Sequence, residues 1–200
     1  MSVLILKNII SEGPGTIEEF LRDKGRPYSV VELGEGETPP PLDGFETLVV
    51  MGGPMAIYEA EKYGFLKEGF KAIEEALKRE MSVLGICLGA QAVAHVLGAK
   101  VYKGHTQEMG WLDVELTYAG LEDRVVSTLS DGGGGRIKVF HWHGDTFNLP
   151  GGARRLARSK DYENQAFGYG KKVYGLQFHI EVTPEMVSRW FRGEAEEARM

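Results

Sequence analysis

The sequence predicts an α/β protein with three layers, in which a mainly parallel central sheet carries helices on both faces and antiparallel strands are added to it. Up to about residue 100, short apolar segments of strand length alternate with segments of helical periodicity, as in a parallel sheet. Beyond that point, strand-like segments follow one another across turns, which indicates antiparallel strands. The length of 200 residues suits one domain, and we expect it to span 1–200.

In the first half, we expect strands at residues 3–9, 28–32 and 47–51 and helices at 16–24 and 63–80. The acidic, proline-rich stretch 34–41 predicts a surface loop. The long helix has apolar residues at helical spacing, so these side chains should face the core. They are Phe65, Leu66, Phe70, Ile73 and Leu77.

In the second half, residues 100–102, 112–116, 136–141 and 174–179 have the pattern of strands, with a loop over 103–107. The glycine-rich run 131–135 predicts a flexible loop tip. A final helix should run from 185 to about 199, because Thr183 is a suitable N-cap and Pro184 suits the first helical position.

The segment around Cys87 has the layout of a nucleophile elbow. A β-branched and apolar run ends in a Gly-x-Cys-x-Gly motif formed by Gly85, Cys87 and Gly89. A helix-like segment follows over residues 91–97. Such a turn delivers one reactive side chain between a strand and a helix, and flanking glycines make room for the strained backbone. A lone cysteine is more often a small buried hydrophobe. Here the paired glycines favour a nucleophile whose thiolate is supported by the helix dipole.

A second segment supplies a base and a group to orient it. His179 and Glu181 follow the apolar run 173–178, at the end of a predicted strand. Side chains alternate along extended backbone, so these two should point the same way. Glu181 would then orient the imidazole while His179 faces Cys87.

Three motifs in this order resemble those of the class I, triad-type glutamine amidotransferases, and the resemblance runs nearly from end to end. The family's nucleophile motif, Gly-x-Cys-x-Gly-x-Gln, is matched by Gly85, Cys87, Gly89 and Gln91. Its His-x-Glu motif is matched by His179 and Glu181. Its oxyanion loop, a Gly-Gly-Pro sequence after a strand, is matched by Gly52, Gly53 and Pro54. Many members have proline where this chain has Ile180. The free-standing branch that resembles the glutaminase domain of GMP synthase tolerates this change.

The resemblance implies a flavodoxin-like fold and a Cys-His-Glu triad. Cys87 would attack the side-chain amide of glutamine and form a γ-glutamyl thioester, with backbone N–H groups of Gly53 and Leu88 holding the oxyanion. It places further residues at the glutamine pocket: Gly52, Pro54, Gln91, and a His143-Gly144-Asp145 turn. The segment 107–111 resembles a Glu-x-Gly-Trp segment at the pocket rim, although a structural turn explains it equally well.

We expect no cofactor and no metal site. His105 has no second ligand at metal spacing. His141 and His143 flank Trp142, so alternation sends both to one face; a zinc pair is possible there, but the sequence offers no third ligand.

Composition narrows the possible partners. The net charge of −6, with no basic cluster, argues against nucleic-acid binding, and no apolar run is long enough to span a membrane. The single cysteine cannot form an internal disulfide, which fits a cytoplasmic protein.

Two enzymatic hypotheses remain open. The first is a glutaminase that passes ammonia to a separate synthetase chain, because this chain carries no ATP-binding motif of its own. The acceptor cannot be named from sequence. The second is a self-sufficient γ-glutamyl peptide hydrolase that uses the same triad. The intact Cys87, His179 and Glu181 argue against a non-catalytic binding module. We slightly favour the first.

Overall fold

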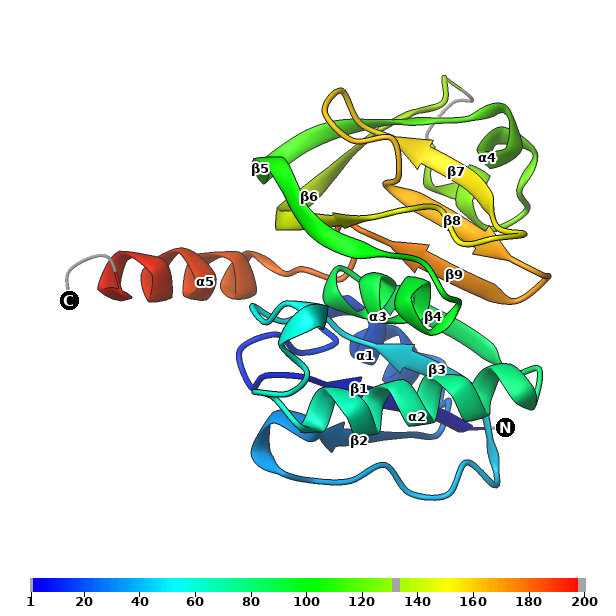
Figure 1. The fold of residues 1–200 in the computed structure, drawn as a ribbon, viewed down its shortest axis with the longest axis vertical. Coiled ribbons are helices and arrows are strands. Elements are labelled where there is room, and N and C mark those ends of the chain that lie inside the picture. The colour runs from blue at the N-terminus through cyan, green and yellow to red at the C-terminus, as the bar shows by residue number, and fades with distance from the viewer. Residues whose placement is uncertain (1, 131–133, 198–200) are drawn as a thin grey trace.

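A computed structural model describes residues 2–130 and 134–197, with side chains through Arg192. Within this part of the chain, nine strands form one sheet in the order β2-β1-β3-β4-β9-β8-β7-β5-β6 (Figure 1). They are β1 (Ser2–Lys7), β2 (Tyr28–Glu32), β3 (Phe45–Val50), β4 (Ser82–Ile86), β5 (Val101–Leu116), β6 (Arg136–Phe147), β7 (Arg154–Arg158), β8 (Ala166–Tyr169) and β9 (Val173–Leu176). The predicted loop tip lies partly outside the described residues, at 131–133, as does the end of the predicted last helix.

Along the sheet, β2, β1, β3, β4 and β9 pair in parallel. The remaining strands, β8, β7, β5 and β6, pair antiparallel. The parallel half has the strand order of flavodoxin-like proteins, whose ligands bind at the carboxyl ends of the strands. The predicted mixed sheet is therefore confirmed.

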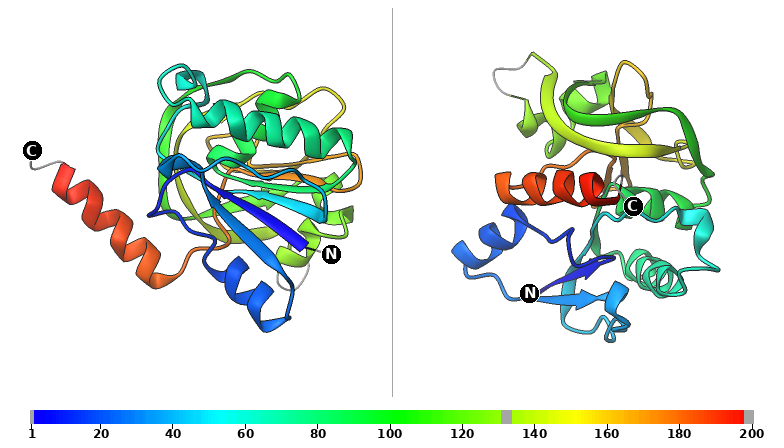
Figure 2. Two further views of the ribbon diagram at one scale, coloured as in Figure 1. Left: turned by 90° about the horizontal axis from the view of Figure 1, so that it is seen from below. Right: turned by 90° about the vertical axis from the view of Figure 1, so that its left-hand side faces the viewer.

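Helices cover both faces of the parallel half. α1 lies on the opposite face from α2 and α3, and α5 projects away from the body (Figure 2). The helices are α1 (Thr16–Asp23), α2 (Phe65–Lys78), α3 (Leu88–Val96), α4 (Tyr118–Glu122) and α5 (Pro184–Glu197), with 3-10 turns η1 (Leu33–Glu35), η2 (Ile57–Glu59) and η3 (Val126–Leu129). The expected cap of α5 is present, because the Thr183 hydroxyl accepts from the Met186 N–H at 3.3 Å. Over the described residues, no helix combines the length and hydropathy needed to cross a membrane.

The core forms where the apolar stripe of α2 meets the sheet. Leu66 and Ile73 are buried, and Phe65, Phe70 and Leu77 pack against the same cluster. The stripe expected from helical periodicity is therefore the core face of α2.

The antiparallel half differs from the sequence prediction. Residues 103–111, expected as a loop or turn, belong to the continuous strand β5. β6 extends to Phe147, well beyond the expected end at 141, and pairs with β5 across one register shift between Lys103 and Glu108. Pairing with β6 thus keeps residues 103–111 extended, although their own sequence does not favour a strand. β7, β8 and α4 were not predicted.

Candidate active site

A cavity of about 470 Å³ opens at the carboxyl ends of the parallel strands. It is lined by residues that follow β1, β3 and β4, and by the far end of β6. Among them are Glu12, Gly53, Cys87, Gln91, His143 and Asp145. The fold thus brings the elbow and the Gly-Gly-Pro loop to one cavity, as the flavodoxin-like topology predicts.

Cys87 occupies a strained turn between β4 and α3. Its φ of 52° and ψ of −110° are unusual for a residue with a side chain. A Cβ on Gly85 would collide with the Gly89 carbonyl, and one on Gly89 would collide with the Val50 carbonyl. The flanking glycines therefore let strand, turn and helix pack closely around the cysteine, as expected for a nucleophile elbow.

His179 and Glu181 make the expected contact, with 2.7 Å between the imidazole Nδ1 and the carboxylate Oε1. The other carboxylate oxygen accepts from the Ile180 N–H at 3.0 Å. Burial alone would lower the pKa of His179, but the negative charges of Glu181 and of a Cys87 thiolate outweigh burial and raise it well above its usual value. The pair can therefore hold an imidazolium beside the thiolate.

The contact does not arise as expected, from His179 ending a strand along which its side chain alternates with that of Glu181. β9 ends at Leu176, and the chain then bends rather than continuing as a strand to residue 179. His179 is instead held by a bridge to β6, in which its N–H donates to the Phe140 carbonyl at 2.8 Å.

Gly52 marks the space shared by the nucleophile and the histidine. A Cβ placed there would lie 3.3 Å from His179 Cε1 and 3.5 Å from Cys87 Cβ, and would collide with the Glu12 carboxylate. All three side chains therefore converge on one backbone position of the Gly-Gly-Pro loop, where a larger residue would displace the Glu12 carboxylate.

The two residues expected to supply oxyanion donors, Gly53 and Leu88, lie in contact. Leu88 is the first residue of α3, so its N–H has no acceptor within the helix. A Cβ on Gly53 would come within 2.9 Å of the Leu88 side chain. Asn8, which the sequence reasoning missed, buttresses the loop: its amide donates to the carbonyls of Met51 and Gly52 at 2.8 and 3.2 Å.

The loop that follows Pro54 is anchored by the chain itself. It forms the turn η2, where the Glu59 carboxylate accepts from the Ala56 N–H at 3.0 Å. Ile57 is buried in the core, and the Tyr58 hydroxyl reaches the Asp145 carboxylate at 3.4 Å. No sequence pattern indicated these anchors, which are contacts within the chain itself.

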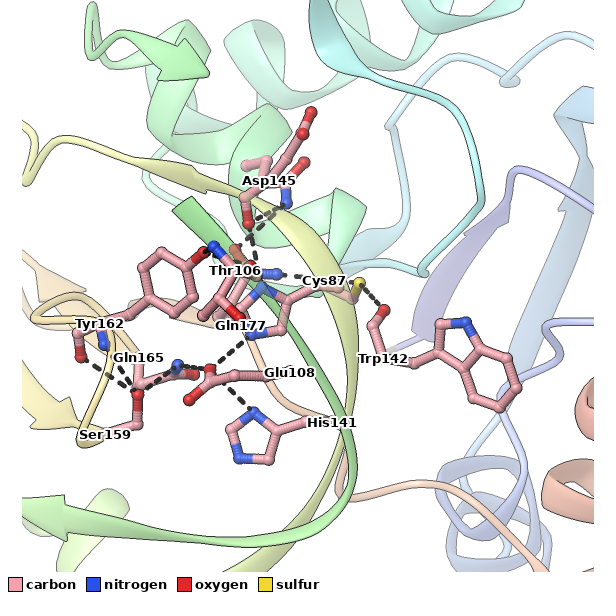
Figure 3. A network of polar contacts seen from close by, with 12 residues as sticks. Cys87, Thr106, Glu108, His141, Trp142, Asp145, Ser159, Tyr162, Gln165 and Gln177 are labelled. Carbon is pink, nitrogen blue, oxygen red and sulfur yellow. Dashed lines mark hydrogen bonds and ion pairs between the residues drawn. The ribbon is translucent and has the colours of Figure 1, made fainter. Parts of the chain in front are cut away.

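Two buried glutamines, Gln91 and Gln177, connect Cys87 to the far wall of the cavity; Figure 3 shows Gln177 beside Cys87. Gln91 donates to the Gln177 side-chain oxygen at 3.2 Å and to the Asp145 carbonyl at 3.4 Å. The Gln177 amide in turn lies 3.8 Å from Cys87 Sγ. Gln91 is thus a buried wall residue, and Gln177 is a second one that sequence reasoning missed.

The expected turn at His143-Gly144-Asp145 was wrong, because these residues belong to the continuous strand β6. They do line the cavity, and the His143 ring is hydrogen-bonded within its wall. Nδ1 donates to the Asp145 carbonyl and Nε2 meets the Glu108 carboxylate, both at 3.0 Å. Burial by itself would raise the pKa of Glu108, but His141, His143 and Ser159 outweigh it and hold that pKa well below its usual range. The segment 107–111 is therefore part of the strand β5 rather than a turn, and it contributes the buried carboxylate of Glu108 behind the cavity wall.

Glu12 is a further carboxyl that the sequence reasoning did not single out. It lies in the loop after β1, lines the cavity, and is only partly exposed. Burial raises its pKa to about 7, against the opposing charge of His179. The carboxyl of Glu12 therefore lies close to His179, and its protonation state changes near neutral pH.

Comparison with known proteins agrees with this geometry. The family model for class I glutamine amidotransferases matches residues 9–192. The glutamine amidotransferase-like protein YfeJ of Salmonella typhimurium is 34% identical over 180 residues, covering 88% of this chain and 74% of the relative. A GMP synthase of Porphyromonas gingivalis is 32% identical over 72% of this chain, which spans only 26% of that relative.

A crystal structure of a glutamine amidotransferase from Thermotoga maritima superposes with a TM-score of 0.90 at 42% identity, covering all of this chain and 84% of the other. The family match extends over nearly every residue of the chain and includes the elbow, the oxyanion loop and the His-x-Glu segment. The chain is therefore an enzyme of the class I glutamine amidotransferase family.

Proposed function

We propose that this chain hydrolyses the side-chain amide of glutamine through a γ-glutamyl thioester on Cys87. The observation that carries the proposal is the convergence of Cys87 and His179 on Gly52, beside the cavity that Cys87 and Gly53 line. A nucleophile, a base and an orienting acid within contact distance are the requirements of covalent acyl transfer.

The thiolate would attack the amide carbon, and the carbonyl oxygen would take up the negative charge. The N–H groups of Gly53 and Leu88 are the donors we assign to that oxygen, each worth about 3 kcal/mol by analogy with other oxyanion holes. Two features support the assignment: the Leu88 N–H has no acceptor inside its helix, and Asn8 fixes the carbonyls that precede Gly53.

His179 would give its proton to the leaving ammonia as the C–N bond breaks. The neutral imidazole would then take a proton from water, which attacks the thioester and releases glutamate and the Cys87 thiolate. Glu181, 2.7 Å from the ring, would hold the tautomer and support the imidazolium.

We infer that the ammonia passes to an acceptor on a separate synthetase chain. A relative from Sulfolobus acidocaldarius, whose name makes it one of the subunits of a glutamine-hydrolysing GMP synthase, is 33% identical, with the match covering 70% of each chain. Chains of similar length and sequence thus occur as subunits of such synthases.

A self-sufficient γ-glutamyl peptide hydrolase is the second candidate. The loop at residues 55–58 is already anchored by Ile57, Glu59 and the Tyr58–Asp145 contact. The cavity of about 470 Å³ also lies in the range that accommodates ligands much larger than free glutamine. Both features favour activity without a partner and a bulkier leaving group.

Steady-state assays of the purified chain alone distinguish the two. We expect glutamine to be hydrolysed to glutamate and ammonia, and faster than γ-glutamyl dipeptides, with Cys87→Ser inactive on both. Faster turnover of a dipeptide would contradict the amidotransferase proposal and favour the hydrolase. Glutamine hydrolysis that appears only with a copurifying synthetase would support the amidotransferase and show that the anchored loop is insufficient.

A further inference from the structure

Glu108, His141 and His143 form a buried cluster behind the cavity wall; Figure 3 shows Glu108 beside His141. His141 and His143 are alternate residues of β6, so both face the same side, and β5 brings Glu108 directly opposite His143. One ligand atom from each residue lies within 4.8 Å of the others, and each residue is at most 5% exposed. The sequence offered two histidines without a third ligand, and the pairing of β5 with β6 supplies it.

The cluster contains unpartnered polar atoms. Among the described residues, the buried side-chain nitrogens and oxygens that lack a hydrogen-bond partner are both ring nitrogens of His141 and the Gln165 Oε1; His141 Nδ1 has only the 3.5 Å ion-pair contact with Glu108. Gln165 belongs to the same network, because its amide donates to the Glu108 carboxylate. Buried polar groups are almost always satisfied, so their concentration at one place points to a missing ligand.

The distances suit a small divalent ion. Glu108 Oε2 lies 3.0 Å from His143 Nε2 and 3.5 Å from His141 Nδ1. Zinc bonds of about 2.0–2.2 Å in tetrahedral geometry place ligand atoms roughly 3.3–3.5 Å apart, so small side-chain shifts would complete the site. Two imidazoles and one carboxylate are donors that zinc accepts readily.

The surroundings match those of metal-binding histidines. His143 Nδ1 donates to the Asp145 carbonyl at 3.0 Å, so Nε2, which lies 3.0 Å from Glu108, is the nitrogen that would bind an ion once it gives up its proton. Gln165 orients the carboxylate by donating to it. Such outer contacts fix the ring tautomer and the ligand orientation in known metal sites. A second surface cavity, lined by Glu108 and Ser159, provides a route of entry.

We propose that Glu108, His141 and His143 bind one zinc ion that braces the substrate cavity from behind. The ion joins β5 to β6 and fixes the His143 ring. That ring holds the Asp145 carbonyl, which also accepts from Gln91. The site is structural: it lies behind the wall that faces Cys87 and takes no part in the thioester chemistry. It is also independent of which substrate the enzyme takes.

The test is zinc binding by the full chain, purified without a metal-binding tag, stripped with a chelator and dialysed against buffered micromolar zinc. We expect one zinc per chain by elemental analysis, and a higher melting temperature than the stripped protein. Glu108→Gln and His141→Ala should each lower zinc content at least tenfold. The exposed His95→Ala is the matched control, and Cys87→Ser must keep its zinc, because a thiolate and His179 are a competing site.

Cobalt substitution gives a readout on the wild-type protein, so the proposal can be tested even where a variant fails to fold. We expect visible d–d bands of a low-coordinate nitrogen and oxygen site, without a thiolate charge-transfer band. Zinc content below about 0.1 per chain, content unchanged in a folded His141→Ala protein, or a thiolate band that disappears in Cys87→Ser would each overturn the proposal.

Discussion

Cys87 adopts a backbone conformation that costs a non-glycine residue roughly 1–3 kcal/mol. The surrounding packing maintains it: the Cys87 N–H donates to the Leu176 carbonyl at 2.8 Å, and both neighbouring glycines sit where no Cβ fits. This backbone conformation places the thiol at the carboxyl end of β4, where it lines the cavity. At this scale the sequence was most informative, because an elbow is a local motif whose glycines can be read in order.

Residues that support the site through distant contacts were not predictable in this way. Asn8 reaches Met51 across 43 positions, and Gln177 reaches Gln91 across 86. A lone asparagine or glutamine carries no local pattern, and its role appears only once the strand order brings the two segments together.

Variants of His179 and Glu181 test the division of labour in the triad. His179→Ala should lower kcat by about 10²–10⁴, the usual contribution of a general acid–base. Glu181→Gln should retain more activity, because the amide oxygen still accepts from Nδ1. Since Glu181 raises the pKa of His179, this variant should also shift the alkaline limb of the kcat/KM profile to lower pH.

His95→Ala removes an exposed histidine that packs on Phe70 and serves as the control for general effects of losing an imidazole. Wild-type activity in both His179→Ala and Glu181→Gln would refute the triad, and an alkaline limb that moves to higher pH would refute the charge argument.

At the scale of elements, the parallel half was predictable and the antiparallel half only in part. Apolar periodicity located α2, and the alternation of strands with helices located β1 to β4. β7 begins with two arginines and β8 has only four residues, so neither has a pattern that distinguishes it from a loop. β5 owes its full length to pairing with β6, which is a tertiary effect.

The segment between β1 and α1 provides a test of how the elements enclose the site. It places Glu12 beside the triad with a pKa of about 7. Between about pH 4.5 and 7, the unfolded chain has released this proton while the folded chain keeps it, so the carboxyl lowers stability as pH rises. Glu12→Gln should therefore become more stable than wild type by about 1–3 kcal/mol at pH 8, with little difference at pH 4.

Chemical denaturation at the two pH values measures this difference. Glu19→Gln, which neutralises an exposed carboxylate on α1, should give the same small difference at both. A Glu12→Gln protein whose stability relative to wild type is independent of pH, or falls as pH rises, would contradict the raised pKa of Glu12.

At the scale of the whole molecule, one sheet brings segments from both halves of the chain to a single edge. Cys87 follows β4, the oxyanion loop follows β3, and His179 follows β9, which pairs directly with β4. The sequence predicted these three positions because parallel strands present their carboxyl ends together. It could not predict that β5 and β6 would close the cavity from the other side, since that depends on their register.

The proposed chemistry depends on Cys87 being the nucleophile that this arrangement presents to a γ-glutamyl substrate. Intact-protein mass spectrometry after treatment with an electrophilic glutamine analogue tests it most directly. Cys87 is the single cysteine of the chain, so we expect one adduct, mapped to Cys87, slowed by excess glutamine and absent from Cys87→Ala. Undiminished labelling of Cys87→Ala, or labelling that glutamine does not slow, would contradict the assignment.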